Sequence, residues 1–101
     1  MEYNRVHVSG KMVGRDEVRS SPAGVRLCDL KIEHRSRQPD GTGWKEVRFV
    51  ARVRVSDPYL DMLLDLPLGE PLEIQGYLGR QSHQDAQLII YAWAVHRLNQ
   101  E

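Results

Sequence analysis

The sequence predicts an all-β fold, a five-stranded and partly open barrel with one short helix between the third and fourth strands. Three observations lead to this prediction. Apolar and polar residues alternate along several segments of strand length, turn residues separate these segments, and one segment has helical spacing instead. A chain of 101 residues holds one core, so residues 1–101 are expected to form a single domain.

The first two strands are expected at residues 4–13 and 25–35. Val6, Val8 and Met12 share one face of the first, and Cys28, Leu30 and Ile32 share one face of the second. Residues 20–24 between them read Ser-Ser-Pro-Ala-Gly, which favours a turn because proline presets φ and glycine accepts a positive φ. Cys28, the single cysteine, is therefore expected in the core and has no disulfide partner.

The third strand is expected at residues 44–55, after a loop at residues 38–43 that is rich in turn residues. Its odd positions are expected to face the core, and its even positions are expected to place three arginines on one exposed face. The core-facing set is Val47, Phe49, Ala51, Val53 and Val55, and the arginines are Arg48, Arg52 and Arg54.

Residues 57–66 have the apolar spacing of a short helix, with Asp57 as its cap and Pro58 in its first turn. Pro67 and Gly69 end it. A fourth strand is expected at residues 72–76 and a fifth at residues 88–95, separated by a polar loop at residues 81–87. The order β-β-β-α-β-β is that of the OB-fold.

The last strand is apolar on both faces, although a barrel interior covers only one of them. Leu88, Ile90, Ala92 and Ala94 share one face. We expect the opposite face to form the interface of a homodimer, with cover by the helix or a loop as the alternative. The expected interface residues are Ile89, Tyr91, Trp93 and Val95.

Charge is balanced overall but unevenly distributed. Fourteen cations match fourteen carboxylates, yet residues 1–56 hold twelve cations against seven carboxylates, and residues 57–101 hold two against seven. Eleven of the cations are arginines, which pair bidentately with phosphate and stack on bases. This distribution indicates a basic binding face.

Several classes of function are not supported. The four histidines have no ligand spacing, and the densest carboxylates, Asp57, Asp61 and Asp65, recur along one helix stripe, so neither a metal site nor a metal-dependent nuclease is expected. No nucleophile elbow or phosphate loop is present, and we expect no enzyme and no small-molecule substrate. No apolar run is long enough to cross a membrane and no signal peptide is recognisable, so the cytoplasm is expected.

Four segments resemble one family. They read Asn-Arg-Val-His-Val-Ser-Gly at residues 4–10, Ser-Pro-Ala-Gly-Val at residues 21–25, Ile-Glu-His-Arg-Ser-Arg-Gln at residues 32–38 and Ile-Gln-Gly-Tyr-Leu at residues 74–78. They are similar to the primosomal replication protein N (PriB) branch of the bacterial single-stranded DNA-binding proteins, from residue 4 to about residue 95. Glu-His-Arg-Ser at this distance after Ser-Pro-x-Gly is the most specific feature.

The resemblance implies an OB-fold homodimer that binds single-stranded DNA without sequence preference and assists a primosomal helicase and other replication-restart proteins. It implies no cofactor. Arg35 matches the arginine of Glu-His-Arg-Ser, and Ser21 matches the serine of the turn motif. Arg48 stands where some relatives have a surface tryptophan, and the loop at residues 80–86 lacks the lysines of well-known relatives. The basic surface is therefore expected on the third strand.

The expected DNA contacts are Ser21, Arg35, Arg37, Trp44, Lys45, Arg48, Arg52, Arg54 and Arg80. A simpler alternative is that Arg48, Arg52 and Arg54 form a solvent-exposed barrel face that binds nothing. Trp44 could likewise cap the mouth of the barrel instead of stacking on a base. Tyr77, Tyr91 and Trp93 are expected to serve packing or the interface rather than base stacking. Two further hypotheses stay open: an OB-fold adaptor for proteins with weak or lost DNA binding, and an RNA-binding OB protein.

Overall fold

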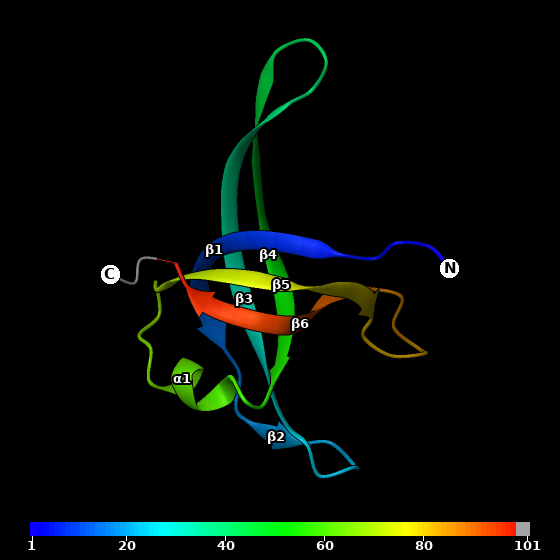
Figure 1. Cartoon of the computed structure of the whole chain (residues 1–101), viewed down its shortest axis with the longest axis vertical. Helices are drawn as coiled ribbons and strands as arrows, with labels where there is room; N and C mark the ends of the chain where they lie inside the picture. Colours follow the sequence, from blue (N-terminus) through cyan, green and yellow to red (C-terminus); the bar gives the residue numbers. More distant parts are fainter. Residues whose placement is uncertain (99–101) are drawn as a thin grey trace.

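The computed structural model describes residues 1–98, which form six strands and one short helix (Figure 1). The predicted strands are all present, and a two-residue strand is added after the first. In chain order the elements are β1 (Val6–Arg15), β2 (Arg19–Ser20), β3 (Arg26–Pro39), β4 (Trp44–Ser56), α1 (Leu60–Leu64), β5 (Pro71–Arg80) and β6 (Leu88–Arg97).

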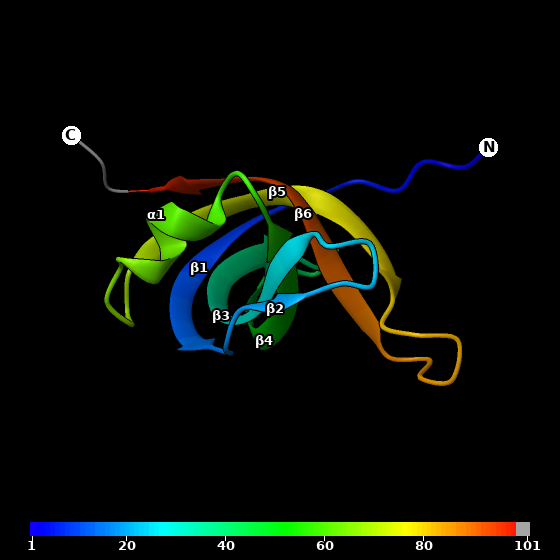
Figure 2. The same ribbon diagram turned by 90° about the horizontal axis from the view of Figure 1, so that it is seen from below.

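Five strands form a barrel, which confirms the predicted OB-fold. β1 pairs antiparallel with β5 and, from Lys11 onward, with β3. β3 pairs with β4, and β5 pairs with β6. The ring closes where β4 and β6 run parallel for two residue pairs, Val53 with Ile90 and Arg54 with Tyr91. Within residues 1–98 the added strand β2 pairs with β3 alone, and it lies at the end of the molecule opposite the long hairpin (Figure 1), the end that Figure 2 views from below.

The barrel interior holds one core, built from the alternating faces that the sequence predicts. Cys28 is fully buried within it, as expected for a small core residue. Burial raises the pKa of its thiol, with further increases from the charges of Asp16 and Asp29. The other buried side chains of the core are Met12, Leu30, Ile32, Val53, Val55, Leu60, Leu63, Leu66, Leu72, Ile74, Ile90 and Val95.

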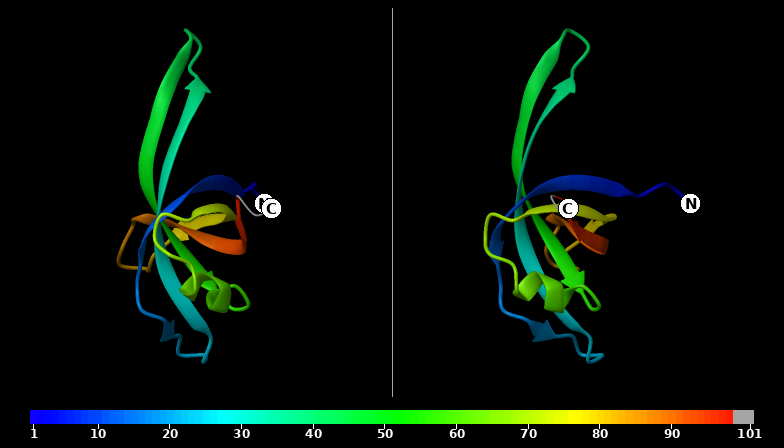
Figure 3. Two further views of the ribbon diagram at one scale, coloured as in Figure 1. Left: turned by 90° about the vertical axis from the view of Figure 1, so that its left-hand side faces the viewer. Right: turned by 60° about the vertical axis from the view of Figure 1, so that its left-hand side comes forward.

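The β3–β4 hairpin is much longer than the barrel that it helps to form. Residues 33–50 are here called the arm, and the far end of the arm extends well beyond the barrel in Figures 1 and 3. The core-facing alternation ends at Ile32 and Ala51. Beyond them β1 still contacts the base of the hairpin, where Lys11 pairs with Glu33 and the Ser9 carbonyl oxygen lies 2.7 Å from His34 Nδ1, but within the described residues no other strand pairs with the hairpin past Glu33. Phe49, expected in the core, is therefore 42% exposed and stacks on His34 at a centroid distance of 4.8 Å.

The helix is shorter than residues 57–66. α1 begins after Tyr59, and Asp57 does not cap it, because both carboxylate oxygens of Asp57 accept hydrogen bonds from Arg26, at 3.0 and 2.8 Å. At its other end, Arg15 Nη1 donates to the carbonyl oxygens of Leu63 and Leu66, each at 2.8 Å. The helix is thus held between two arginines of the barrel.

The prediction that Ile89, Tyr91, Trp93 and Val95 form an exposed apolar face of the last strand is wrong for Ile89 and Val95. Val95 belongs to the core, because a β-bulge leaves Trp93 unpaired between Ala92 and Ala94 and shifts the alternation by one residue. Ile89 is also buried within the chain, beside the closure with β4. Only Trp93 stays exposed, with Tyr91 half-buried.

Candidate nucleic-acid interface

The register of the β3–β4 hairpin decides which basic side chains lie together, because directly paired residues share a face. The face turned away from the core, here called the outer face, carries most of the predicted contacts. Its pairs, from barrel to tip, are Asp29 with Arg54, Lys31 with Arg52, Glu33 with Val50, Arg35 with Arg48, Arg37 with Glu46, and Pro39 with Trp44. Lys45 pairs with Gln38 and lies on the opposite face of the hairpin.

On the arm, the outer face presents exposed cations beside an exposed aromatic ring. Arg35 and Arg48 are both exposed and take part in none of the ion pairs found among residues 1–98. The guanidinium of Arg37 lies 5.8 Å from the ring centre of Trp44, whose surface is 66% exposed. The arm therefore offers charge and a stacking surface that the fold itself does not use.

On the barrel, the outer-face arginines are held by a buried carboxylate. Arg54 Nε and Nη2 donate to the two oxygens of Asp29 at 2.9 and 3.2 Å. Arg19 and Arg52 approach the same carboxylate at 3.5 and 4.0 Å. The prediction that Arg48, Arg52 and Arg54 line one exposed face is wrong in this respect, since the side chain of Arg54 is only 19% exposed and that of Arg52 34%. Arg19, Arg52, Arg54 and Asp29 are called the arginine cluster below.

The arginine cluster sets the protonation of Asp29. Burial alone would raise the pKa of this carboxyl, but the hydrogen bonds and charge of Arg54, with the charges of Arg19 and Arg52, outweigh burial and hold the pKa below its ordinary value. In return, the hydrogen bond to Asp29 raises the pKa of Arg54. Asp29 is thus an anion at neutral pH, surrounded by three cations.

An aromatic groove of about 400 Å³ adjoins the arginine cluster. Tyr77 stacks on Tyr91 at 5.1 Å between ring centres, and Trp93 lies 6.0 Å from Tyr77 at a tilt of 42°. Arg54 lies over the Tyr91 ring at 5.7 Å and Arg5 over the Trp93 ring at 5.4 Å. None of Arg5, Arg19 and Asp29 was among the predicted contacts, and no sequence spacing relates them to these rings.

The two remaining predicted contacts lie away from the arm. Ser21 lines the aromatic groove, and its hydroxyl accepts a hydrogen bond from the Val25 amide at 3.2 Å. Arg80 ends β5, where its Nη2 donates to the carbonyl oxygen of His83 at 2.9 Å. The loop that follows β5 leaves the side of the barrel rather than the arm (Figure 1). Arg80 is therefore not part of the outer-face surface.

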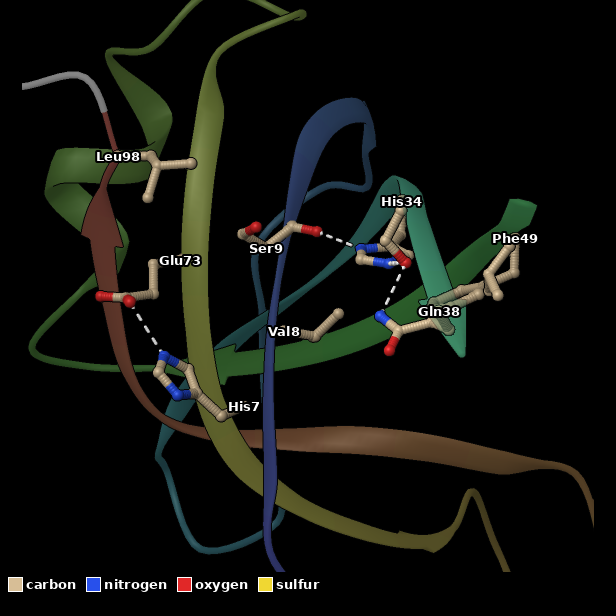
Figure 4. Close-up of a pocket in the computed structure, with 10 residues that line it drawn as sticks. His7, Val8, Ser9, His34, Gln38, Phe49, Glu73 and Leu98 are labelled. Carbon is tan, nitrogen blue, oxygen red and sulfur yellow. Dashed lines mark hydrogen bonds and ion pairs between the residues drawn. The ribbon is translucent and has the colours of Figure 1, made fainter. Parts of the chain in front are cut away.

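A second concavity, of about 500 Å³, lies on the other face of the hairpin, between the base of the arm, β1 and β5 (Figure 4). His34 Nδ1 is 2.7 Å from the Ser9 carbonyl oxygen, to which it donates, and its Nε2 is 2.7 Å from the Ser36 hydroxyl. His7 instead contacts Glu73, at 2.8 Å. Both ring nitrogens of His34 are thus occupied within the fold.

Neither a cluster of metal-ligating side chains nor a membrane-spanning helix is present in the part of the chain described. No group of three or more histidine, cysteine, aspartate or glutamate side chains within residues 1–98 is placed to hold a metal ion. Within the same residues, no helix has the length and apolar character that crossing a bilayer requires.

Comparison with known proteins identifies the family. A family model with the description "Another single-strand binding protein family" matches residues 4–93. The replication restart protein PriB of Photobacterium profundum is 32% identical over 93 residues, covering 88% of both chains. The chain belongs to the PriB family of single-strand binding proteins. The resemblance noted in the sequence is thereby confirmed.

Solved PriB structures share the fold. PriB from Ralstonia solanacearum superimposes with a TM-score of 0.84 at 20% identity, covering 96% of this chain and 99% of that one. A dimeric structure of the N-terminal domain of PriB from Thermoanaerobacter tencongensis gives a TM-score of 0.72 at 17% identity, with coverage of 98% and 100%. The long hairpin and barrel described above therefore belong to a fold found in other PriB proteins.

Proposed function

We propose that this protein binds single-stranded DNA without sequence preference, as an accessory of the replication-restart primosome in the cytoplasm. Membership of the PriB family supports the proposal. The observation that carries it is the outer face of the arm, where Arg35 and Arg48 lie side by side, exposed and in none of the ion pairs found among residues 1–98. Two like charges directly opposite each other destabilise a strand pair, so a role outside folding accounts for their presence.

The side chains on the arm fit a strand that is bound by its backbone and its base faces. Arginine pairs with phosphate oxygens whatever the base, and the exposed Trp44 ring offers a stacking surface to any base. Arg37, stacked beside Trp44, adds charge next to that ring. Binding of this kind tolerates all sequences, because phosphate contacts and stacking do not read the base edges.

The test is a fluorescence-anisotropy titration of a labelled oligothymidine of about 30 nucleotides, long enough for more than one OB-fold site. Unlabelled competitors of equal length follow: mixed-sequence single-stranded DNA, duplex DNA and RNA. We expect mixed-sequence single strands to compete as well as oligothymidine and duplex DNA to compete poorly. Failure to bind even at low salt would overturn the proposal, and stronger competition by RNA would favour an RNA-binding role.

The proposal includes a homodimer, with its interface moved away from the outer face of β6. Four exposed apolar side chains gather around one concavity of about 300 Å³ between β1, β4, β5 and β6: Phe49, Val50, Leu78 and Leu88. An exposed apolar surface of this kind favours self-association. Light scattering of Leu88→Glu should report a monomer, and Trp93→Glu should remain dimeric. The reverse result would return the interface to Tyr91 and Trp93.

A second candidate is the protein adaptor with weak or lost DNA binding. Leu64 and Leu68 are exposed at and just after α1, in a segment that also carries the exposed carboxylates of Asp61 and Asp65. A primosomal helicase is the partner that we propose for this segment. Pull-down of the purified helicase should be lost in a Leu64→Ser, Leu68→Ser variant. Helicase binding without any single-strand binding by the unaltered chain would favour the adaptor over the first proposal.

A further inference from the structure

The arginine cluster has a charge excess that its own carboxylate does not cancel. Asp29 contributes one negative charge, whereas Arg19, Arg52 and Arg54 contribute three positive charges within 4.0 Å of it. The carboxylate is almost wholly buried, at 5% exposure, while the side chains of Arg19 and Arg52 are 47% and 34% exposed. The excess charge therefore lies on the solvent side of the cluster.

The same carboxylate also fixes the position of that charge. Arg54 is held by two hydrogen bonds to Asp29, and Arg52 is held from a second side, where its Nη1 donates to the Gln81 side-chain oxygen at 3.2 Å. Guanidinium groups that are already positioned lose less conformational freedom when they bind a phosphate. The cluster is thus a pre-positioned anion-binding surface rather than a set of mobile surface cations.

The aromatic groove supplies a rigid planar surface next to the arginine cluster. The Tyr91 ring lies against Gly79, where a Cβ atom would come within 2.8 Å of the ring, and the Tyr91 hydroxyl donates to the Arg80 carbonyl oxygen at 2.8 Å. Tyr77 stacks almost parallel on it, at 10°. Tyr77 and Trp93 stay 37% and 49% exposed, so ring surface remains open to a ligand.

Arg54 joins the two features, since it pairs with Asp29 and lies over the Tyr91 ring at 5.7 Å. We propose that the aromatic groove and the arginine cluster together hold one nucleotide of the bound strand, with its base on the exposed rings of Tyr77 and Trp93 and its phosphate at Arg19 and Arg52. This subsite rests on the proposed function and extends the contact from the arm onto the barrel. Planar rings beside fixed guanidiniums match a base joined to a phosphate.

A second copy of the chain fits this surface less well. A symmetric dimer brings the same patch of both copies together, so an interface here would gather two copies each of the Arg5 and Arg54 guanidiniums in one buried region. Like charges that approach within a desolvated interface repel strongly. A polyanion, in contrast, is attracted by every cation around the groove.

Tryptophan fluorescence separates this subsite from the arm, because the chain contains only Trp44 and Trp93. In Trp44→Phe, Trp93 is the single reporter, and oligothymidine should quench it. In Trp93→Phe, Trp44 reports on the arm alone. Quenching of Trp44 with no change at Trp93 would overturn the subsite while leaving the proposed function intact, and no binding by the unaltered chain would overturn both.

Affinity measurements separate base stacking from phosphate contact. We expect Trp93→Leu to weaken binding of an oligothymidine of about 16 nucleotides roughly tenfold and to have no effect on an abasic oligomer of the same length. Tyr3→Leu is the matched control, because Tyr3 is 95% exposed and lies outside the groove. Equal losses with both oligomers, or a monomer in light scattering of Trp93→Leu, would contradict a stacking role.

The phosphate half of the subsite is tested by salt dependence. Arg19→Gln should reduce the slope of log affinity against log salt by about 0.7, the value for one phosphate contact with a single strand. Arg97→Gln is the control, because Arg97 is paired with Glu70 at 2.8 Å and is not part of the cluster. An unchanged slope for Arg19→Gln would overturn the assignment of this cluster as a phosphate site.

Discussion

The two halves of one hairpin use the same alternation of side chains in different ways. On the barrel half of the outer face, Arg54 pairs with the buried Asp29. On the arm half, Arg48 pairs with another arginine, Arg35, and both are exposed. Arg54 is therefore part of the fold and Arg48 is free for a ligand because different residues lie opposite them, although both arginines hold equivalent places in the alternation.

The largest difference is expected in stability. Asp29→Ala should lower the free energy of unfolding by about 3 kcal/mol, because it leaves the partly buried Arg54 without its counter-charge. Arg48→Ala should change it by no more than about 0.5 kcal/mol. Urea unfolding of the two variants measures both values. Similar losses would contradict the division of the hairpin into a structural and a free half.

Acid should weaken the ion pair between Asp29 and Arg54 and so lower the free energy of unfolding. The pKa of Asp29 in the folded chain lies below its value in an unfolded chain, which is about 3.9. The stability that the ionised carboxylate contributes is therefore fully present above the unfolded pKa, and it is lost as pH falls through the folded-state pKa. We expect the unfolding free energy of the unaltered chain to fall below about pH 4. Asp29→Asn should be less stable at neutral pH and lack this part of the acid dependence. A parallel decline in both would show that other carboxyls dominate.

Substitutions on the arm should weaken DNA binding and leave stability unchanged, in contrast to substitutions of Asp29. Trp44→Leu should weaken oligothymidine binding by about 1 kcal/mol, roughly fivefold, because a stacking surface is lost. Its unfolding free energy should stay within about 0.5 kcal/mol, since the ring is mostly exposed. Anisotropy titration and urea unfolding give the two numbers. A stability loss without a binding loss would make Trp44 a structural residue.

The sequence predicted the barrel well because its evidence is local. Alternation in each strand, a glycine-bearing turn and one segment of helical spacing are read from neighbouring residues, and all five expected strands are present in the fold. The helix ends were less predictable, since Asp57 is engaged by Arg26, 31 residues earlier in the chain.

The binding surface was only partly predictable, because its properties depend on pairing between distant residues. Arg48 and Arg54 occupy equivalent positions in the alternating pattern of the sequence. Arg54, however, is hydrogen-bonded to Asp29, which lies 25 residues earlier in the chain. The bulge at Trp93 likewise turns Val95 into the core, whereas uninterrupted alternation along the strand would place Val95 on the outer face. Replacing Arg48, Arg52 and Arg54 together would therefore disturb the fold as well as the surface.

The central claim is that the exposed arm arginines bind phosphate, and the salt dependence of oligothymidine binding tests it most directly. The variant is Arg35→Gln, Arg48→Gln, and the control is Arg26→Gln, whose guanidinium is already shared by Asp57 and Asp61. The slope of log affinity against log salt should fall by about 1.4 in the double variant, for two lost phosphate contacts, and stay unchanged in the control. Equal slopes in the double variant and the unaltered chain would contradict the claim.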